Sequence, residues 1–325
     1  MELMDLMKKV VKEFDERGGL KNVIWIACGG SAGGFYPAHF LLEHEARGIK
    51  TTTVTSNEFV YAPLVCCDKN TLAVLCSMRG TPETCEAAKK AKESGAVTIG
   101  LYVQESELTK TCDHNIQYSS IAEDSSMAED VNSSVGLNIA FHLLYLLEDY
   151  AYYNEAMEGF QIIDDIYRNA VKYCMPRAKN FAAECKDDPV VYVMGSGSSL
   201  GAAYIFSICN LMEMQWVHSP TIHTGEFFHG PFEVLDKNLP VFLLIGEGRT
   251  RPMDLRAQEF LRQYGERIYV LDAKELGINR ISDRVSEYFN HILFAPILNN
   301  TYLRELAVAK KHNYLNRRYM WKVKY

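Results

Sequence analysis

The stretch that decides the fold is NVIWIACGGSAGGFYPAHFLLEHEA, residues 22–46. Its β-branched and apolar residues at 23–27 are typical of a buried strand. A loop of small residues follows, and a helix is predicted from Phe35 onward. This order of strand, small-residue turn and helix is the repeating unit of parallel α/β proteins.

The same pattern returns in PVVYVMGSGSSLGAAYIFSICNLMEMQW, residues 189–216. Here a strand is predicted at 190–194 and a helix from Gly201. Further strand candidates alternate with helices after each copy, which indicates parallel sheets covered on both faces. They lie at 51–54, 72–76, 96–101 and 114–117 in the first half, and at 221–223, 241–245 and 267–271 in the second.

A mainly helical stretch, residues 134–185, separates the two halves. We therefore predict two α/β domains joined by helices, each a parallel sheet flanked by helices in a flavodoxin-like three-layer sandwich. The first, with a leading helix, takes residues 1–155. The second, with linker helices and a C-terminal tail, takes residues 156–325. One large α/β domain is the alternative, since 325 residues fit either arrangement.

Composition excludes several classes of function. The net charge is −7, and no clustered basic face is evident, so no nucleic-acid partner is expected. No run of eighteen apolar residues predicts a membrane span, and the N-terminal amphipathic helix carries too many charges for a signal peptide. The nine cysteines have no metal-binding or redox spacing, so we expect reduced thiols, no metal and a cytoplasmic protein.

The two glycine-rich loops are candidate anion sites. A loop that opens a helix points unpaired amides at a ligand, and the helix dipole favours negative charge. Gly30 and the hydroxyl of Ser31 are the candidates in the first loop, and residues 195–199, GSGSS, form the second. Neither loop has a nucleotide-binding signature, and both are also compatible with simple tight turns.

A third segment strengthens the prediction of a phosphate site. Residues 76–84, CSMRGTPET, follow the strand predicted at 72–76. Hydroxyls at a strand end, with proline in the first turn of the next helix, suit both phosphate binding and helix capping. The candidates are Ser77, Gly80, Thr81 and Thr84; a helix cap alone is the alternative.

Glu213 is the only Asp, Glu, Lys or Arg between Asp188 and Glu226. A carboxylate in apolar surroundings must be paired, neutralised or directed into a cleft, and its raised pKa suits a group that exchanges protons near neutral pH. An exposed position on the helix is the alternative. Glu213 lies 14 residues after Ser199, about 21 Å along a helix, so it must serve a site built by another part of the fold or by a second subunit.

His229 is the second acid–base candidate. It stands between Phe228 and a Gly-Pro turn, which would hold the imidazole in a defined place. Imidazole exchanges protons with sugar oxygens at neutral pH. His218 and His223 compete for this role.

With these segments in hand, the chain resembles the fructosamine-6-phosphate deglycases of the tandem sugar-isomerase (SIS) domain superfamily. The matching segments are IACGGS, SNEF, TPET, ICNLMEMQWVHS, IHTGEFFHGPFE and the tail RRYMWKVKY. A more distant likeness is to the isomerase half of glucosamine-6-phosphate synthase, which has the same interval of sixteen between Glu and His and a lysine near its C-terminus.

The resemblance implies hydrolysis of a 6-phosphorylated Amadori product to glucose 6-phosphate and an amino acid, without a metal or organic cofactor. It implies that Glu213 moves a proton between C1 and C2, that His229 handles ring opening, and that Lys322 positions the substrate. The matched segments add Glu58 and Glu226 as substrate-binding candidates. A homodimer or higher homo-oligomer with shared active sites is expected.

Two other functions compete. An aldose–ketose or amino-sugar phosphate isomerase would use the same Glu and His. A non-catalytic sugar-phosphate sensor would need a DNA-binding segment, for which the first twenty residues are too short.

The chain departs from the family at the phosphate loop, where SMRGTPET is one residue shorter than the relatives' pattern. Either Gly80 keeps the glycine's role in a tighter turn, or Cys76 replaces the first serine and Arg79, the glycine's substitute, contacts phosphate. Near the other end, Glu247, Arg249 and Arg251 are candidates for selecting the amino acid that the sugar carries.

Overall fold

The computed structural model describes residues 2–324. It contains two compact units, Met1–Phe160 and Gln161–Tyr325, called here the N-terminal and the C-terminal unit. The division falls within the long helix α8 (Tyr153–Cys185). The domain boundary predicted between residues 155 and 156 lies in the same helix and stays a prediction.

The N-terminal unit is built on a five-stranded sheet in the order β2-β1-β3-β4-β5, with every pair parallel. This is the flavodoxin-like order, in which the chain reverses its direction of winding between β1 and β3. The strands are β1 (Asn22–Ala27), β2 (Lys50–Thr55), β3 (Thr71–Cys76), β4 (Val97–Tyr102) and β5 (His114–Gln117).

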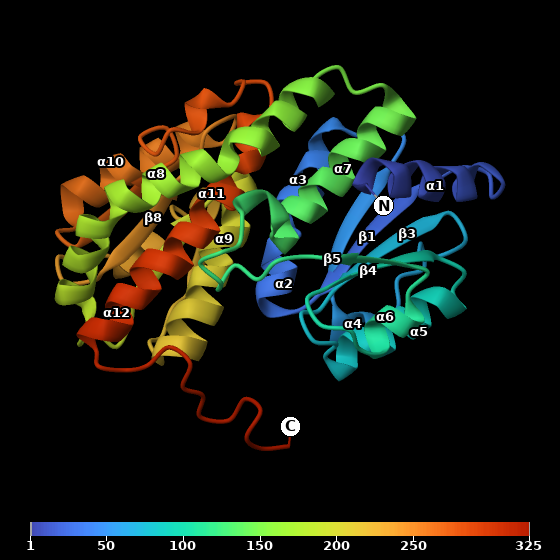
Figure 1. Ribbon diagram of the computed structural model, residues 1–325. Helices are drawn as coiled ribbons and strands as arrows, with labels where there is room; N and C mark the ends of the chain where they lie inside the picture. Colours follow the sequence, from blue (N-terminus) through green and yellow to red (C-terminus); the bar gives the residue numbers. More distant parts are fainter. Residues whose placement is uncertain (1, 325) are drawn as a thin grey trace. The chain divides into compact units, whose positions relative to one another are not determined.

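Helices cover both faces of this sheet, so the predicted three-layer α/β class is confirmed (Figure 1). On one side α1 and α3 pack against α7; on the other α5 packs against α4 and α6. The helices are α1 (Leu3–Asp15), α2 (Gly29–Gly34), α3 (Tyr36–Glu45), α4 (Ser56–Tyr61), α5 (Pro82–Glu93), α6 (Glu107–Thr111), the short 3-10 helix η1 (Ala128–Asp130) and α7 (Asn132–Glu148).

The apolar run of β1 is buried on both faces, as a central parallel strand requires. Ile24 and Ile26 belong to the core cluster that includes Phe59 of α4 and the alanines of α5. On the opposite face the ring of Trp25 lies 5.0 Å from that of Phe35. Sheet and helices are therefore held together by contacts on alternate residues of one strand.

One local prediction was wrong. The glycine-rich stretch after β1, predicted as a loop, is itself a helix, α2. Phe35 both ends α2 and caps the start of α3, so the helix predicted from Phe35 onward is present. Gly29 turns the chain at once, with φ +57°. Gly34 lies so close to Asn132 of α7 that a methyl group would meet its amide at 2.3 Å. Small residues are thus needed here for close helix packing.

The C-terminal unit has a four-stranded parallel sheet in the order β7-β6-β8-β9, again with a reversal, between β6 and β8. The strands are β6 (Tyr192–Gly195), β7 (Thr221–His223), β8 (Val241–Ile245) and β9 (Ile268–Asp272). The strand predicted at 190–194 begins two residues later than expected, because Val190 makes only an isolated bridge to His218.

Both faces of β8 are buried. Leu243 and Ile245 belong to the cluster that includes Ala257 and Leu261 of α10. Phe242 packs on the other face against Phe181 of α8, at 5.3 Å between ring centroids. The unit's remaining elements are η2 (Gly197–Ser199), α9 (Leu200–Ile205), η3 (Phe206–Glu213), η4 (Thr224–Glu226), η5 (Pro231–Val234), α10 (Arg251–Tyr264), η6 (Ile278–Arg280), η7 (Ser286–Phe289), α11 (Asn290–Ile297), η8 (Leu298–Leu303) and α12 (Arg304–Ala309).

Two of these elements, η3 and η8, are π-helices, a rare form that is frequent at functional sites. They pack against each other, and the side-chain amide of Asn210 donates a buried 2.9 Å hydrogen bond to Asn299 Oδ1. The last residue of η3 is Glu213. The helix predicted for this segment is present, but in the wider π form.

Candidate active site

Four hydroxyl residues, Ser56, Ser77, Thr81 and Thr84, meet at the carboxyl edge of the N-terminal sheet; we call them the hydroxyl cluster. Ala27 of β1 pairs with both Thr55 and Cys76, the last residues of β2 and β3. The residues that follow these two strands therefore begin at the same height along the sheet edge. Open α/β sheets bind ligands at this edge, beside the strands where the winding reverses.

The hydroxyl cluster forms a continuous chain of hydrogen bonds. Ser56 Oγ lies 2.8 Å from Thr84 Oγ1, which lies 3.0 Å from Thr81 Oγ1. Ser77 Oγ accepts a 2.9 Å bond from the backbone N–H of Thr81. Ser56, Ser77 and Thr84 are buried, whereas Thr81 is exposed. The sequence thus correctly grouped Ser77, Thr81 and Thr84, but missed Ser56, which lies 28 residues from Thr84.

Gly80 holds the turn between β3 and α5. Its φ is +71°, and a methyl group there would meet Ser106 Oγ at 2.2 Å. Arg79 is exposed, while Cys76 is the buried last residue of β3, where burial raises the pKa of its thiol to about 11. The geometry favours the first of the two alternatives for the shortened loop, in which Gly80 keeps the glycine's role.

The other candidates of the N-terminal unit lie on neighbouring elements. Gly30 and Ser31 are half-buried in α2, directly after β1. Glu58 is exposed in the first turn of α4, where its backbone N–H donates to the capping Thr55 Oγ1 at 3.3 Å. All three therefore follow β1 or β2, at the same edge of the sheet as the hydroxyl cluster.

Glu213 lies at the C-terminal end of η3 with 22% of its side chain exposed. Burial raises the pKa of its carboxyl, and an adjacent guanidinium, that of Arg317, opposes this rise. The chain reverses just beyond it, at Trp216, whose φ of +56° is unusual for a residue other than glycine. A half-buried carboxyl with a raised pKa can accept and return a proton near neutral pH.

Arg317, which the sequence did not single out, is the partner of Glu213. Its Nε and Nη2 both lie 2.7 Å from Glu213 Oε1, and the side chain is 8% exposed. The only sequence signal is the tail motif that contains it, and within that motif the resemblance points to Lys322 instead. Lys322 is exposed, and among residues 2–324 no interaction of its side chain with Glu213 occurs.

His229 lies in the exposed turn between η4 and η5, and its backbone N–H donates to Glu226 O at 2.9 Å. The buried Phe227 anchors this turn, packing 5.0 Å from Phe228 between ring centroids. Within the described part of the chain, His229 and Glu213 make no hydrogen bond. Of the competing histidines, His223 accepts from Gly225 N at 3.0 Å and so acts as a helix cap.

The charged residues after β8 are paired within the unit. Arg251 contacts both carboxylate oxygens of Asp272, at 2.8 and 2.7 Å. Arg249 Nε donates to Glu287 Oε1 at 2.8 Å. Glu247 lies 3.5 Å from Arg251. These internal pairs give the charges a role in holding the loop, and selection of an amino acid remains a prediction.

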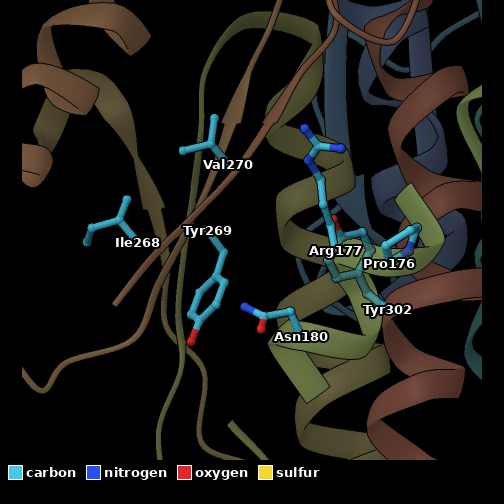
Figure 2. A pocket seen from close by; sticks show the side chains of 7 residues that line it. All are labelled: Pro176, Arg177, Asn180, Ile268, Tyr269, Val270 and Tyr302. Carbon is cyan, nitrogen blue, oxygen red and sulfur yellow. The ribbon is translucent and has the colours of Figure 1, made fainter. Parts of the chain in front are cut away.

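A cavity of about 380 Å³ lies away from all of these residues, in the C-terminal unit. Residues of α8, the edge strand β9 and η8 line it, as Figure 2 shows: Pro176, Arg177, Asn180, Ile268, Tyr269, Val270 and Tyr302. It contains none of the predicted site residues. The residues 2–324 also contain no cluster of three His, Cys, Asp or Glu side chains suited to a metal, and no helix long and apolar enough to cross a membrane.

Comparisons with known proteins give several relatives. The chain is 38% identical over 308 residues to the fructosamine deglycase FrlB of Bacillus subtilis, covering 94% of this chain and 93% of the relative. It is 21% identical over 316 residues to the fructoselysine 6-phosphate deglycase of Escherichia coli K12, covering 97% and 89%. No family model matches.

Solved structures also show relatives of this chain. One from Salmonella typhimurium LT2, assigned to the phosphosugar isomerases, has a TM-score of 0.94 and 39% identity and covers both chains completely. The C-terminal domain of glucosamine-fructose-6-phosphate aminotransferase from Francisella tularensis has a TM-score of 0.78 at 18% identity, covering 94% of this chain and 89% of that one. The second likeness concerns the fold alone.

Proposed function

The chain belongs to the fructosamine deglycases of the SIS superfamily, and from this membership we propose its reaction and the residues that perform it. It is an enzyme that hydrolyses a fructosamine 6-phosphate to glucose 6-phosphate and a free amino acid. The observation that carries this is the 38% identity to a fructosamine deglycase over almost the whole of both chains.

The chemistry needs one group that moves a proton between neighbouring carbons. Once the sugar ring is open, Glu213 removes a proton from C1, and an enaminol forms. Return of a proton to C2 gives an imine, and water then releases the amine and leaves the aldehyde of glucose 6-phosphate. The half-buried position and raised pKa of Glu213 support this role.

His229 is proposed to transfer the proton that opens the ring. Its exposed turn gives access to a sugar oxygen, and its anchored aromatic neighbour limits its movement. The hydroxyl cluster, with Gly80, Gly30 and Ser31, is proposed to hold the 6-phosphate through hydroxyl and backbone donors. Glu58, Glu226 and Lys322 are proposed to contact the remainder of the substrate.

We further propose that each sheet unit is one SIS domain, with the boundary at residues 155 and 156, and that the enzyme is a cytoplasmic homodimer or higher homo-oligomer with shared active sites. Exposed apolar side chains next to Glu213, Met212 at 41% and Trp216 at 44%, support burial against a second copy.

The Glu213→Gln variant tests the assignment of the base. Gln keeps the shape and can still accept from Arg317, but it cannot take a proton. Turnover of a fructosamine 6-phosphate, followed as glucose 6-phosphate released, should fall by roughly 10²–10⁴-fold. The matched control is Glu259→Gln, which changes an exposed glutamate of α10 and should leave the rate unchanged.

Circular dichroism must show that both variants remain folded. Retained turnover in Glu213→Gln would remove Glu213 from the mechanism. A panel of 6-phosphorylated Amadori compounds with different amino acids, together with simple ketose phosphates, tests the reaction itself. Isomerisation of ketose phosphates without release of amine from any compound would overturn the deglycase function.

A further inference from the structure

The carboxylate of Glu213 is held by one of its two oxygens. Oε1 accepts from both Nε and Nη2 of Arg317, at 2.7 Å each. Within residues 2–324, no donor contacts Oε2. The two oxygens of the carboxylate are therefore not equivalent: one is fixed and the other is available.

Arg317 is itself held in place by the chain around it. Its Nη1 donates to the backbone oxygens of Tyr314, at 2.7 Å, and Asn316, at 3.0 Å. The guanidinium carbon lies 5.4 Å from the ring centroid of Trp321. Since the guanidinium is planar, these contacts define the plane in which it meets the carboxylate.

The segment that carries Arg317 is attached to the end of the helix that carries Glu213. Gln215 Nε2 donates to His312 O at 3.3 Å, and the rings of Trp216 and His312 lie 4.4 Å apart. The guanidinium of Arg318 stacks over Trp216 at 4.4 Å. Three contacts besides the ion pair thus fix the tail near the carboxylate; in Figure 1 the tail is the red coil that follows α12.

This arrangement has two effects on a carboxylate that must accept a proton. Burial raises its pKa, and Arg317 limits that rise by favouring the charged form. Among the described residues, Arg317 is the charged group that acts on Glu213; the nearby His312 and Arg318 pack on Trp216 instead. Fixing Oε1 also directs Oε2, and a base is effective only when its oxygen is aimed at the reacting C–H bond.

We propose that Arg317 is a positioning residue for the base: it clamps Oε1 of Glu213 and leaves Oε2 as the atom that takes the proton from C1 and returns it at C2. The inference rests on the proposed function, because it needs Glu213 to be the base. It gives the C-terminal tail a part in catalysis through Arg317 rather than through Lys322.

The test is the pH dependence of kcat/KM for three variants. Arg317→Met removes the charge and the clamp, so the acidic limb should move up by about one pH unit or more, and the plateau should fall by roughly 10-fold or more. Arg317→Lys keeps a charge but lacks the planar fork, so its limb should stay closer to that of the wild type while its plateau falls. Arg262→Met, which removes an exposed arginine of α10, is the control and should leave both unchanged.

The outcomes separate the inference from the function on which it rests. If Glu213→Gln is inactive but the profiles of Arg317→Met and Arg317→Lys coincide with that of the wild type, the inference about Arg317 is wrong and the base assignment stands. If Glu213→Gln is active, the base assignment fails first. If Arg317→Met does not fold, Arg317→Lys decides: an unchanged plateau overturns the proposal.

Discussion

Among single residues, Gly80 is one whose identity the structure strictly constrains. Its φ is +71°, and a methyl group would lie 2.2 Å from Ser106 Oγ. Gly80→Ala should therefore cost about 1–3 kcal/mol of unfolding free energy, through backbone strain and displacement of Ser106. If the hydroxyl cluster binds phosphate, KM should rise as well, because a shift of the backbone at residue 80 would displace Thr81, the next residue and a member of the cluster.

Gly19→Ala is the matched control for this prediction. Gly19 has a φ of +90°, but nothing lies within 4 Å of its added methyl group. It should show the strain without the collision, and with no change in KM. Urea unfolding and steady-state kinetics measure both quantities. Equal losses of stability and equal KM values in the two variants would contradict the role given to Gly80.

Single residues also show what sequence reasoning can reach. Glu213 stood out because it is the one charge in a long apolar stretch, a property visible along the chain. Arg317 did not, because its importance comes from a contact across 104 residues of sequence. It lies in a motif with several other cations, and nothing in their order distinguishes the one that becomes buried. Ser56 was missed for the same reason.

At the scale of elements, the same strand–turn–helix is used differently in the two units. Thr84 lies two residues after Pro82 in α5, and Asp254 lies two residues after Pro252 in α10. Asp254 is fully buried; Ser196 Oγ donates to its Oδ1 at 2.6 Å and Gly246 N to its Oδ2 at 3.1 Å. In the C-terminal unit, the carboxylate of Asp254 thus accepts hydrogen bonds from the loops that follow β6 and β8. In the N-terminal unit the corresponding position holds Thr84, whose hydroxyl could donate to a phosphate.

Asp254 gives a prediction about stability and pH. Burial raises the pKa of its carboxyl to about 6, above the usual value of the unfolded chain. The folded protein therefore binds this proton more tightly, and the stability that it contributes at low pH is lost as the pH rises through about 6. From pH 5 to 7.5 this loss amounts to about 1.4 kcal/mol.

Asp254→Asn removes the titrating group and should remove this part of the pH dependence. The measurement is the urea-unfolding free energy of both proteins at pH 5 and 7.5, compared as a difference between pH values. The wild type should lose about 1.4 kcal/mol more than the variant over that interval. An identical change in the two proteins would show that Asp254 does not titrate there.

Elements were more predictable than contacts. The strands at 114–117, 221–223 and 241–245 were placed at their observed bounds. Of these, β8 is a continuous apolar run because both of its faces are buried, whereas β5 and β7 are edge strands and only partly buried. The helix α2 was missed because four of its six residues are glycine, which has little helix propensity. The π form of η3, which packs against η8, has no local sequence pattern that predicts it.

At the scale of the whole molecule, the proposal that subunits share active sites can be tested by mixing two variants that each lack one part of the site. Thr84→Val removes a hydroxyl from the hydroxyl cluster, and Glu213→Gln removes the base. If one site combines the cluster of one subunit with the base of another, a mixed dimer contains one intact site. Co-expression should then restore about a quarter of wild-type activity.

The control is to mix the purified variants without subunit exchange, which should restore nothing. Light scattering of the wild type gives the number of subunits and so the expected recovery. A co-expressed dimer that remains as inactive as either parent would show that each site is completed within one chain. At this scale the sequence predicted the duplicated parallel sheets correctly, because each copy repeats the same pattern of strand, small-residue turn and helix.

The chain of hydrogen bonds in the hydroxyl cluster has a consequence for how quickly a product leaves. Each of Ser56, Thr81 and Thr84 already has a hydroxyl neighbour within 3.0 Å. The two bonds among these three hydroxyls use two of their three hydrogens, so a phosphate group would find one free donor and would gain the other two only by replacing existing bonds. For each bond replaced in this way, a neutral hydrogen bond is lost and a charge-assisted one, roughly twice as strong, is formed. The net gain is only the difference between the two. If the hydroxyl cluster holds the 6-phosphate, as we propose, this exchange weakens the binding of glucose 6-phosphate and so favours its release.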